Sequence, residues 1–270
     1  MNSSQPTYVV GLMGGLGNNL HQIALGKYLE EKGFRVKFDI TLISPNATVF
    51  EIPSLRDFVL DRKKLLWNFL PSPLGRFRFI AIQIRRLIGP MRVVTSLKAN
   101  DSIDIKDSKG SWLYGYWQRL DYSESIMEEL KDFFLPSYQI GDSIRIHVRH
   151  GDFVGTPSLL DDSYYECALD ELINDKNLHN PVVQIISDSQ SLDVKSMNLA
   201  INAEQVSSAT ILADFQALIN SKYLIISRST FSWWAARISN ADVICPSPWN
   251  SLNPEDDSEI PSAWKKILVN

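Results

Sequence analysis

Residues whose types could do chemistry gather at the end of one hydrophobic strand. Residues 143–148 read Ser-Ile-Arg-Ile-His-Val and run directly into Arg149, His150, Gly151 and Asp152. In open parallel sheets, ligands bind in the crevice beyond the carboxyl ends of the strands. We therefore expect the two imidazoles, the guanidinium and the carboxylate of this segment to lie where a substrate binds. Other parts of the chain must identify the ligand.

Two further strand ends carry polar side chains. Residues 182–187 precede Asp188, and residues 223–227 lead toward a hydroxyl pair, Ser229 and Thr230, ahead of a predicted helix. Hydroxyls, exposed amides and the positive end of a helix dipole together form an anion site suited to a diphosphate. Capping of the helix alone also explains the two hydroxyls, so both interpretations stay open.

An aromatic run follows the hydroxyl pair, with the sequence Phe231-Ser232-Trp233-Trp234. An aromatic face can stack on a base, and large aromatic side chains also fill protein cores. We expect Trp233 and Trp234 in the core, whereas Phe231 fits either role.

A glycine-rich turn lies near the start of the chain, where residues 11–19 read Gly-Leu-Met-Gly-Gly-Leu-Gly-Asn-Asn. It follows a predicted strand and opens a predicted helix, a context in which backbone amides can face an anion or a sugar. The spacing fits neither the dinucleotide-binding pattern nor the P-loop, which also requires a lysine after its last glycine. A tight turn that needs a positive φ angle explains the glycines equally well.

The elements that must position these groups alternate between strand and helix. In the first half, the pattern predicts strands over residues 8–11, 34–40 and 111–117 and a helix over residues 20–32. In the second half, it predicts strands over residues 143–148, 182–187, 223–227 and 243–246, with helices between them. Near-continuous apolar strands separated by helices indicate an α/β fold whose parallel sheets are covered on both faces.

The two halves meet near residues 135–142, where Pro136 and Gly141 interrupt the pattern. We therefore predict one domain over residues 1–141 and a second over residues 142–270. The interval 41–107 is irregular, and no topology is predicted for it.

Composition excludes several broad classes of protein. The chain has 270 residues, 44% hydrophobic and 21% charged, as in folded globular proteins of one or two domains. A formal net charge of -4 argues against a protein that binds nucleic acid through general backbone electrostatics. The two cysteines, Cys167 and Cys245, lack the CxxC spacing of a zinc site. We expect two buried thiols in a reducing compartment and no disulfide.

Targeting signals are not evident in the sequence. The first residues are polar, and no apolar run approaches the roughly 20 residues needed to cross a bilayer, so the expected location is the cytoplasm. One segment, which begins at Arg76 and ends at Arg92, interleaves apolar and basic residues without an acid. Such a helix suits an anionic membrane surface, here the inner face of the membrane, and an exterior helix with one buried face explains the pattern equally well.

Five motifs occur in a specific order along nearly the whole chain. They are Gly14-Gly15-Leu16-Gly17-Asn18, Gly115-Tyr116-Trp117-Gln118, His147-Val148-Arg149 with Gly151-Asp152, Ser187-Asp188, and Ser229-Thr230-Phe231-Ser232-Trp233-Trp234. This order resembles the α-1,2-fucosyltransferase family of bacterial type, glycosyltransferase family 11. The resemblance implies a GT-B-like fold of two facing Rossmann-like domains, with the acceptor side in the first and the donor nucleotide in the second.

The resemblance also implies an activity. Members are inverting glycosyltransferases that move L-fucose from GDP-β-L-fucose to O2 of a terminal galactose, with no metal and no cofactor. The implied acceptor is an oligosaccharide or a surface glycan such as an O-antigen. If that glycan is lipid-linked, the segment 76–92 would bring enzyme and acceptor together at the membrane.

The resemblance assigns the donor phosphates to three side chains. Arg149 would hold the β-phosphate, and Ser229 and Thr230 would hydrogen-bond the phosphates. Departure of GDP develops negative charge, which a metal-free enzyme must offset with a guanidinium, amides and hydroxyls.

The resemblance assigns the guanine base to three other side chains. Phe231 would lie against the base, while His147 and Asp214 would read it. A carboxylate can accept hydrogen bonds from both guanine N–H groups, which adenine does not offer in the same pattern. An acid in the first turn of a helix is the other explanation of Asp214. The implied GDP-fucose site comprises Gly15, Gly17, His147, Arg149, Asp188, Asp214, Ser229, Thr230, Phe231 and Ser232.

Catalysis by such an enzyme needs a general base for the acceptor hydroxyl. Asp152 is the candidate, and its alternative role is to pair with Arg149 and orient it. Asn18 resembles the asparagine of the family's glycine turn, which would reach fucose or the acceptor, and an N-cap role is its alternative. Asp152, Arg149 and Asn18 are thus the candidate catalytic residues.

Three positions depart from the family pattern. His150 stands where a second arginine is usual, and Asn19 and His21 stand where glutamine and phenylalanine are usual. A histidine carries only part of a charge at neutral pH, so the donor site, the pH optimum or the acceptor can differ. The alternatives are a transferase of another GDP-sugar, such as GDP-mannose, and a catalytically silent sugar- or nucleotide-binding relative.

Overall fold

The computed structural model describes residues 6–63, 92–96, 110–137, 141–189, 192–199, 201–251 and 257–269, without the side chains of 92, 93, 95, 96, 137, 141, 142 and 152. Its internal contacts divide the chain into two compact units, Met1–Glu129 and Leu130–Asn270. The predicted border between residues 141 and 142 falls inside the second unit. The basic segment 76–92, apart from the backbone of Arg92, lies outside the described residues.

The first unit is built on a parallel sheet in the order β2-β1-β4-β3. Its strands are β1 (Thr7–Gly11), β2 (Arg35–Asp39), β3 (Arg92–Ser96) and β4 (Ser111–Gly115). Its helical elements are α1 (Leu16–Glu31), η1 (Thr48–Glu51), α2 (Pro53–Asp61), α4 (Leu120–Ser123) and η2 (Glu124–Ile126). Strand β3 was not predicted, because it lies in the interval whose sequence showed no regular pattern.

Helix α1 begins earlier than the predicted start at residue 20. The glycine-rich turn of residues 11–19 is already helical from Leu16. The prediction followed apolar residues at helical spacing, but the first turns of α1 also bury the polar side chains of Asn19 and Gln22. Hydrogen bonds satisfy these groups, so the helix does not need an apolar face there.

The second unit contains a six-stranded, entirely parallel sheet in the order β10-β9-β8-β5-β6-β7. The strands are β5 (Gly141–Val148), β6 (Val183–Ser187), β7 (Ala203–Gln205), β8 (Ser221–Ile225), β9 (Asp242–Ser247) and β10 (Lys265–Leu268). The helical elements are α5 (Met127–Phe134), which spans the border of the two units, η3 (Leu135–Ser137), η4 (Gly151–Phe153), α6 (Asp162–Lys176), η5 (Val194–Met197), α7 (Ile211–Ile219) and α8 (Thr230–Ile238).

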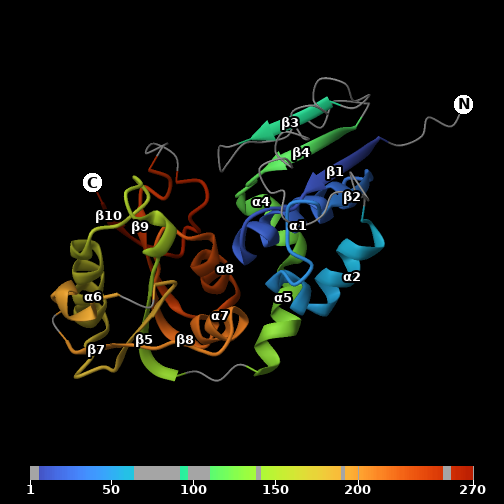
Figure 1. Ribbon diagram of the computed structural model, residues 1–270. Coiled ribbons are helices and arrows are strands. Elements are labelled where there is room, and N and C mark those ends of the chain that lie inside the picture. The colour runs from blue at the N-terminus through green and yellow to red at the C-terminus, as the bar shows by residue number, and fades with distance from the viewer. Residues whose placement is uncertain are drawn as a thin grey trace, which may run out of the picture. The chain divides into compact units, whose positions relative to one another are not determined.

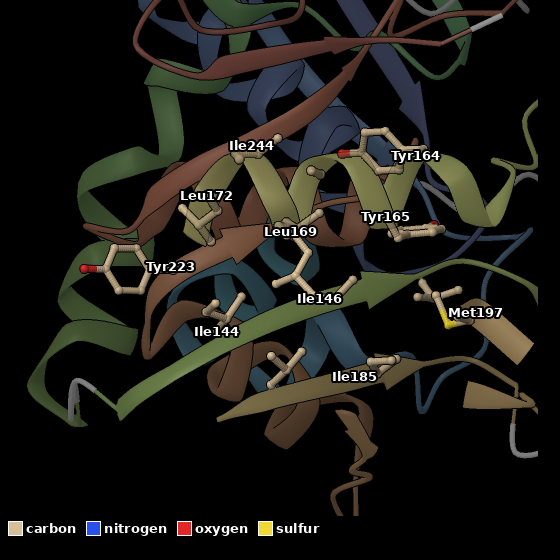
Figure 2. Close-up of a cluster of buried hydrophobic side chains, with 14 of the residues drawn as sticks. Ile144, Ile146, Tyr164, Tyr165, Leu169, Leu172, Ile185, Met197, Tyr223 and Ile244 are labelled. Carbon is tan, nitrogen blue, oxygen red and sulfur yellow. The ribbon is translucent and has the colours of Figure 1, made fainter. Parts of the chain in front are cut away.

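Strand β5 divides its side chains between two layers of helices, which Figure 1 shows as α6 on one side of the sheet and α7 and α8 on the other. Ile144 and Ile146 are fully buried in a cluster with Tyr164, Leu169 and other residues of α6 (Figure 2). Each such isoleucine contributes roughly 1.5–3 kcal/mol through burial. The alternate residues of β5 face the opposite layer, as the hydrogen bond from Arg145 to the Ala217 carbonyl of α7 demonstrates.

The strand order locates the ligand-binding edge of the second unit. From β5 the chain proceeds outward through β6 and β7, then returns to β8 on the other side of β5 and proceeds outward through β9 and β10. The order therefore reverses between β5 and β8, and in open parallel sheets ligands bind beyond the carboxyl ends of the two strands at such a point. The polar groups that follow β5 and β8 lie at this edge.

Two findings concern the remaining predictions. Both cysteines are free thiols, and Cys245 is buried, as predicted, but Cys167 is exposed. Cys167 belongs to α6, whose buried face is formed by Tyr164, Tyr165 and Ala168, and it lies on the outward face. Within the described ranges, no helix has both the length and the apolar character required to cross a membrane.

Candidate active site

His147 lies near the end of β5 on the side of the sheet that carries α8. The residue is 2% exposed, and its Nδ1 is 2.9 Å from Ser227 Oγ. Its ring centroid is 5.5 Å from that of Phe231 in α8. Burial, reinforced by the charge of Arg149 and opposed by that of Asp188, lowers the pKa of His147 to about 3. The imidazole is therefore neutral near pH 7, so it can hydrogen-bond a ligand but adds no charge to an anion site.

Asp188 is the acidic partner of Arg149. Its Oδ2 is 3.1 Å from Nη1 of Arg149, and its Oδ1 accepts hydrogen bonds from the backbone N–H groups of His150 (2.9 Å) and Gly151 (3.1 Å). A Cβ on Gly151 would lie 2.6 Å from Asp188 Oδ2, so a larger residue here would displace this carboxylate. One carboxylate after β6 thus fixes both the guanidinium and the backbone that follows β5.

Asp152 follows these residues in the short turn η4. Its side chain is not among those described, and its role as general base stays a prediction. Its alternative role, pairing with Arg149, also stays a prediction, and Asp188 is an acid that the structure shows paired with Arg149. Sequence reasoning predicts Asp188 in the donor site, and the structure adds that its carboxylate organises the neighbouring groups.

The start of α8 presents the predicted hydroxyl pair. Ser229 is the N-cap, and its Oγ accepts a hydrogen bond from the Phe231 N–H at 3.3 Å, so the capping interpretation is confirmed for this residue. Thr230 is the first residue of the helix and is half-buried. The buried Ser232 hydroxyl donates to the Ser229 carbonyl at 3.3 Å. These bonds fix the orientation of the helix N-terminus, whose dipole favours an anion.

A row of aromatic rings connects the start of α7 with His147. The ring centroid of Phe215 in α7 lies 5.1 Å from that of Phe231, and the Phe231 ring in turn lies against His147. Asp214, next to Phe215, accepts a hydrogen bond at 2.7 Å from the Ser208 N–H through Oδ1. Asp214 lies in the first turn of α7, which agrees with its interpretation as a helix N-terminal acid. It also lies on the helix whose Phe215 contacts Phe231. The predicted base-reading residues are thus brought into one neighbourhood.

The predicted core role of Trp233 and Trp234 is confirmed. Their side chains are 1% and 0% exposed, and Trp233 Nε1 donates to the Glu259 carbonyl at 2.8 Å.

Arg228 is a residue at this edge that sequence reasoning missed. The residue is 9% exposed, and its guanidinium donates to the carbonyls of Pro248 (3.0 Å) and Pro157 (3.2 Å). The sequence offered one signal for it, a charged residue directly after an apolar strand. Because an arginine is rarely buried unless it is paired, such a residue points to specific partners.

The glycine turn belongs to the first unit. Gly14 has φ +79°, so the interpretation as a tight turn with a positive φ angle is confirmed. Gly15 is the exposed N-cap of α1, and Gly17 and Asn18 lie in the first helical turn. The N-cap alternative for Asn18 is therefore wrong, because Gly15 occupies that position.

A buried polar cluster holds the glycine turn in place. Gln22 of α1 donates to the Gly115 carbonyl at the end of β4 (2.9 Å), and its Oε1 accepts from the Met13 N–H (2.9 Å). The Asn19 amide donates to the Met13 carbonyl at 3.0 Å. Asn19, one of the departures from the family pattern, thus acts inside the first unit as a support for the turn.

Asp39 is the last residue of β2, and it is a second buried polar group near the carboxyl ends of the strands in the first unit. The carboxylate is 1% exposed and accepts hydrogen bonds of 2.5 Å from Thr41 Oγ1 and from the Tyr114 hydroxyl. A Cβ on Gly11 would lie 2.2 Å from the Tyr114 ring, so glycine is required where β1 ends. Asp39 thus ties the end of β2 to the end of β4 through the Tyr114 hydroxyl.

Over the described ranges, no three His, Cys, Asp or Glu side chains lie close enough together to hold a metal ion.

Comparison with solved structures identifies the fold. The chain is similar to the *Escherichia coli* heptosyltransferase WaaC with ADP, with a TM-score of 0.51 and 10% identity over 98% of this chain and 93% of that one. It is also similar, with a TM-score of 0.45 and 14% identity, to the fucosyltransferase NodZ from *Bradyrhizobium*, over 87% of this chain and 94% of that one. The likeness to the heptosyltransferase, together with the two parallel sheets, confirms the predicted GT-B-like α/β fold.

Comparison with characterised sequences identifies the family. The chain is 28% identical to an alpha-1,2-colitosyltransferase of *Escherichia coli*, over 96% of this chain and 98% of that protein. The model of the family described as "Glycosyl transferase family 11" matches residues 94–267, which include the strand ends that carry His147, Arg149, Asp188 and Ser229. Since this match covers well over half of the sequence, the chain belongs to glycosyl transferase family 11.

Proposed function

We propose that this protein is an inverting galactoside α-1,2-L-fucosyltransferase. It transfers fucose from GDP-β-L-fucose to O2 of a terminal galactose in an oligosaccharide or surface glycan, and it needs no metal. The observation that carries the proposal is the Arg149–Asp188 pair beyond the carboxyl ends of β5 and β6, in a chain of family 11.

Departure of the diphosphate is the step that this edge favours. In the proposed reaction, the bond between fucose C1 and the β-phosphate oxygen breaks as negative charge develops on GDP. Arg149 is held by Asp188 and remains partly exposed, so its guanidinium is proposed to face the departing phosphate. The N-terminus of α8, oriented by Ser229, supplies amides and a positive dipole end to the same anion.

Guanine recognition is proposed for the aromatic row. Phe231 is half-buried and can offer a face to the base, and neutral His147 can hydrogen-bond it. Asp214 uses Oδ1 to hold Ser208, and within the described part of the chain no hydrogen bond engages its Oδ2. This oxygen is proposed to accept from the guanine N–H groups.

Activation of the acceptor completes the proposed mechanism. The galactose O2–H gives its proton to Asp152, and O2 attacks C1 of fucose from the face opposite GDP, which inverts the anomeric configuration. Asn18, in the first turn of α1, is proposed to contact fucose or the acceptor. Both roles are inferred from the positions of the two residues in the family motifs.

A second donor is favoured by a specific finding. The 28% identical relative is named as a colitosyltransferase, and colitose is L-fucose without its 3-hydroxyl. GDP-colitose is therefore the alternative donor for this chain, with the same leaving group and the same bond to be broken.

The test is release of GDP from each donor in the presence and absence of an acceptor. Purified protein is incubated, with EDTA present, with GDP-fucose, GDP-colitose or GDP-mannose and with lactose, N-acetyllactosamine or a galactosyl-β-1,3-N-acetylhexosamine. We expect acceptor-dependent release of GDP from GDP-fucose and an α-1,2 linkage in the product. Preference for GDP-colitose would select the alternative donor, and no release with any galactoside would refute the proposed acceptor.

A matched pair of variants tests the proposed site. Arg149→Met should lower kcat/KM by at least about a hundredfold, because a charge-assisted contact to the departing phosphate is lost. Arg237→Met, at the end of α8 away from its N-terminus, is the control and should change kcat/KM less than about twofold. Equal activity of the two variants would contradict the role of Arg149.

A further inference from the structure

The guanidinium of Arg228 connects the loops that follow three adjacent strands. Arg228 itself follows β8, Pro157 lies in the loop after β5, and Pro248 lies directly after β9. Nε donates to the Pro248 carbonyl at 3.0 Å, and Nη1 donates to the Pro157 carbonyl at 3.2 Å. The planar fork of an arginine can hold two carbonyls in a fixed geometry, which the flexible ammonium of a lysine cannot reproduce.

The contacts of Arg228 that the structure describes are to carbonyl groups. Within the ranges that the structure describes, no carboxylate forms an ion pair with it. Asp257, whose charge acts on Arg228, binds Lys266 at 3.1 Å and Ser247 at 2.6 Å. Burial lowers the pKa of Arg228, but an arginine keeps its proton in proteins. The edge therefore contains a buried positive charge that two carbonyl dipoles only partly offset.

Arg149, the other guanidinium at this edge, has a different charge balance. Its contact with Asp188 at 3.1 Å makes the pair formally neutral. Net positive charge near the end of β8 therefore comes from Arg228 and from the N-terminus of α8, which begins two residues later. The two positive groups follow each other closely in sequence and repel each other. An anion bound at this edge lowers the electrostatic energy of both.

We propose that Arg228 is a positioning residue for the diphosphate of the donor. It holds the loops after β5, β8 and β9 in one arrangement and adds a permanent positive charge behind the N-terminus of α8. This inference rests on the proposed function, because it takes the ligand to be a nucleoside diphosphate. It acts through the loops and the local field, without a direct contact to the reacting atoms.

The experiment compares ligands that differ only in their phosphates. Affinities for GDP, GMP and guanosine are measured by calorimetry on the wild type, Arg228→Met, Arg228→Lys and Arg145→Met. Arg145 is the matched control, because its half-buried guanidinium also donates to a carbonyl, Ala217 at 2.7 Å, but from within β5 and not from its end. Circular dichroism and thermal unfolding verify that each variant is folded.

A selective loss of phosphate affinity is the expected result. Arg228→Met should weaken GDP binding by at least about tenfold and guanosine binding by less than about twofold, and Arg228→Lys should recover part of the loss. Arg145→Met should leave both affinities unchanged. Equal weakening of GDP and guanosine, or no weakening of GDP, would overturn the proposal. If Arg228→Met does not fold, a GDP-to-guanosine affinity ratio in Arg228→Lys equal to that of the wild type would overturn it. Failure of the wild type to bind GDP would refute the proposed function itself.

Discussion

Acid pH should destabilise this protein through two buried histidines, one in each unit. His21 in α1 is 1% exposed and His147 in β5 is 2% exposed. Burial lowers the pKa of each from the ordinary value of 6.5 to about 3. Because the folded-state pKa lies below the unfolded-state value, each histidine takes up a proton on unfolding when the pH lies between these values. The stabilisation is therefore complete above pH 6.5 and is lost as the pH falls toward 3.

The magnitude follows from the two pKa values. For one histidine whose pKa changes from 6.5 to about 3, lowering the pH from about 7.5 to about 5 removes about 2 kcal/mol from the free energy of unfolding. That loss is a large fraction of the stability of a typical domain. His21 serves best as the perturbation, because it lies outside the proposed donor site and phenylalanine has a similar shape.

The assay is hydrogen exchange of α1 and β1, read by mass spectrometry at about pH 7.5 and about pH 5 after correction for intrinsic rates. In the wild type, the opening free energy of these elements should fall by about 2 kcal/mol more than in His21→Phe. The exposed His179 offers the control, and His179→Phe should keep the pH dependence of the wild type. An identical pH dependence in His21→Phe and the wild type would show that the imidazole is not buried in its neutral form.

Two further perturbations test contacts of the site and of the fold. Asp188→Asn keeps an acceptor for the backbone but removes the charge that holds Arg149, so kcat/KM for GDP release should fall by roughly tenfold to a hundredfold, and an unchanged value would exclude this pairing as a catalytic support. Gly110→Ala should reduce the free energy of urea unfolding by more than about 2 kcal/mol, because φ is +71° and the new Cβ would lie 2.1 Å from the Thr7 carbonyl oxygen, whereas Gly15→Ala, with open space around its Cβ, should cost less than about 1 kcal/mol.

Predictions from the sequence were good where local composition decides structure. The apolar runs at residues 143–148 and 182–187 are β5 and β6, because a strand buried on both faces needs continuous apolar side chains. Strands β7 and β10 were not predicted, since they lie at the two ends of the sheet. Their residues are partly exposed, so their sequences lack such a run.

For the candidate site, too, some features could be predicted from the sequence and others depended on the tertiary structure. The types and order of the polar residues, and their positions at strand ends, were readable from the chain because each motif is local. The pairing of Arg149 with Asp188 was not readable, because these residues are far apart in sequence and meet only through the parallel pairing of β5 with β6, which aligns the carboxyl ends of the two strands. Likewise, only the packing of three loops shows that Arg228 is buried between two carbonyls. Local sequence determines which groups a strand end carries, and the strand order determines which of them meet, since contacts between distant segments depend on the whole sheet.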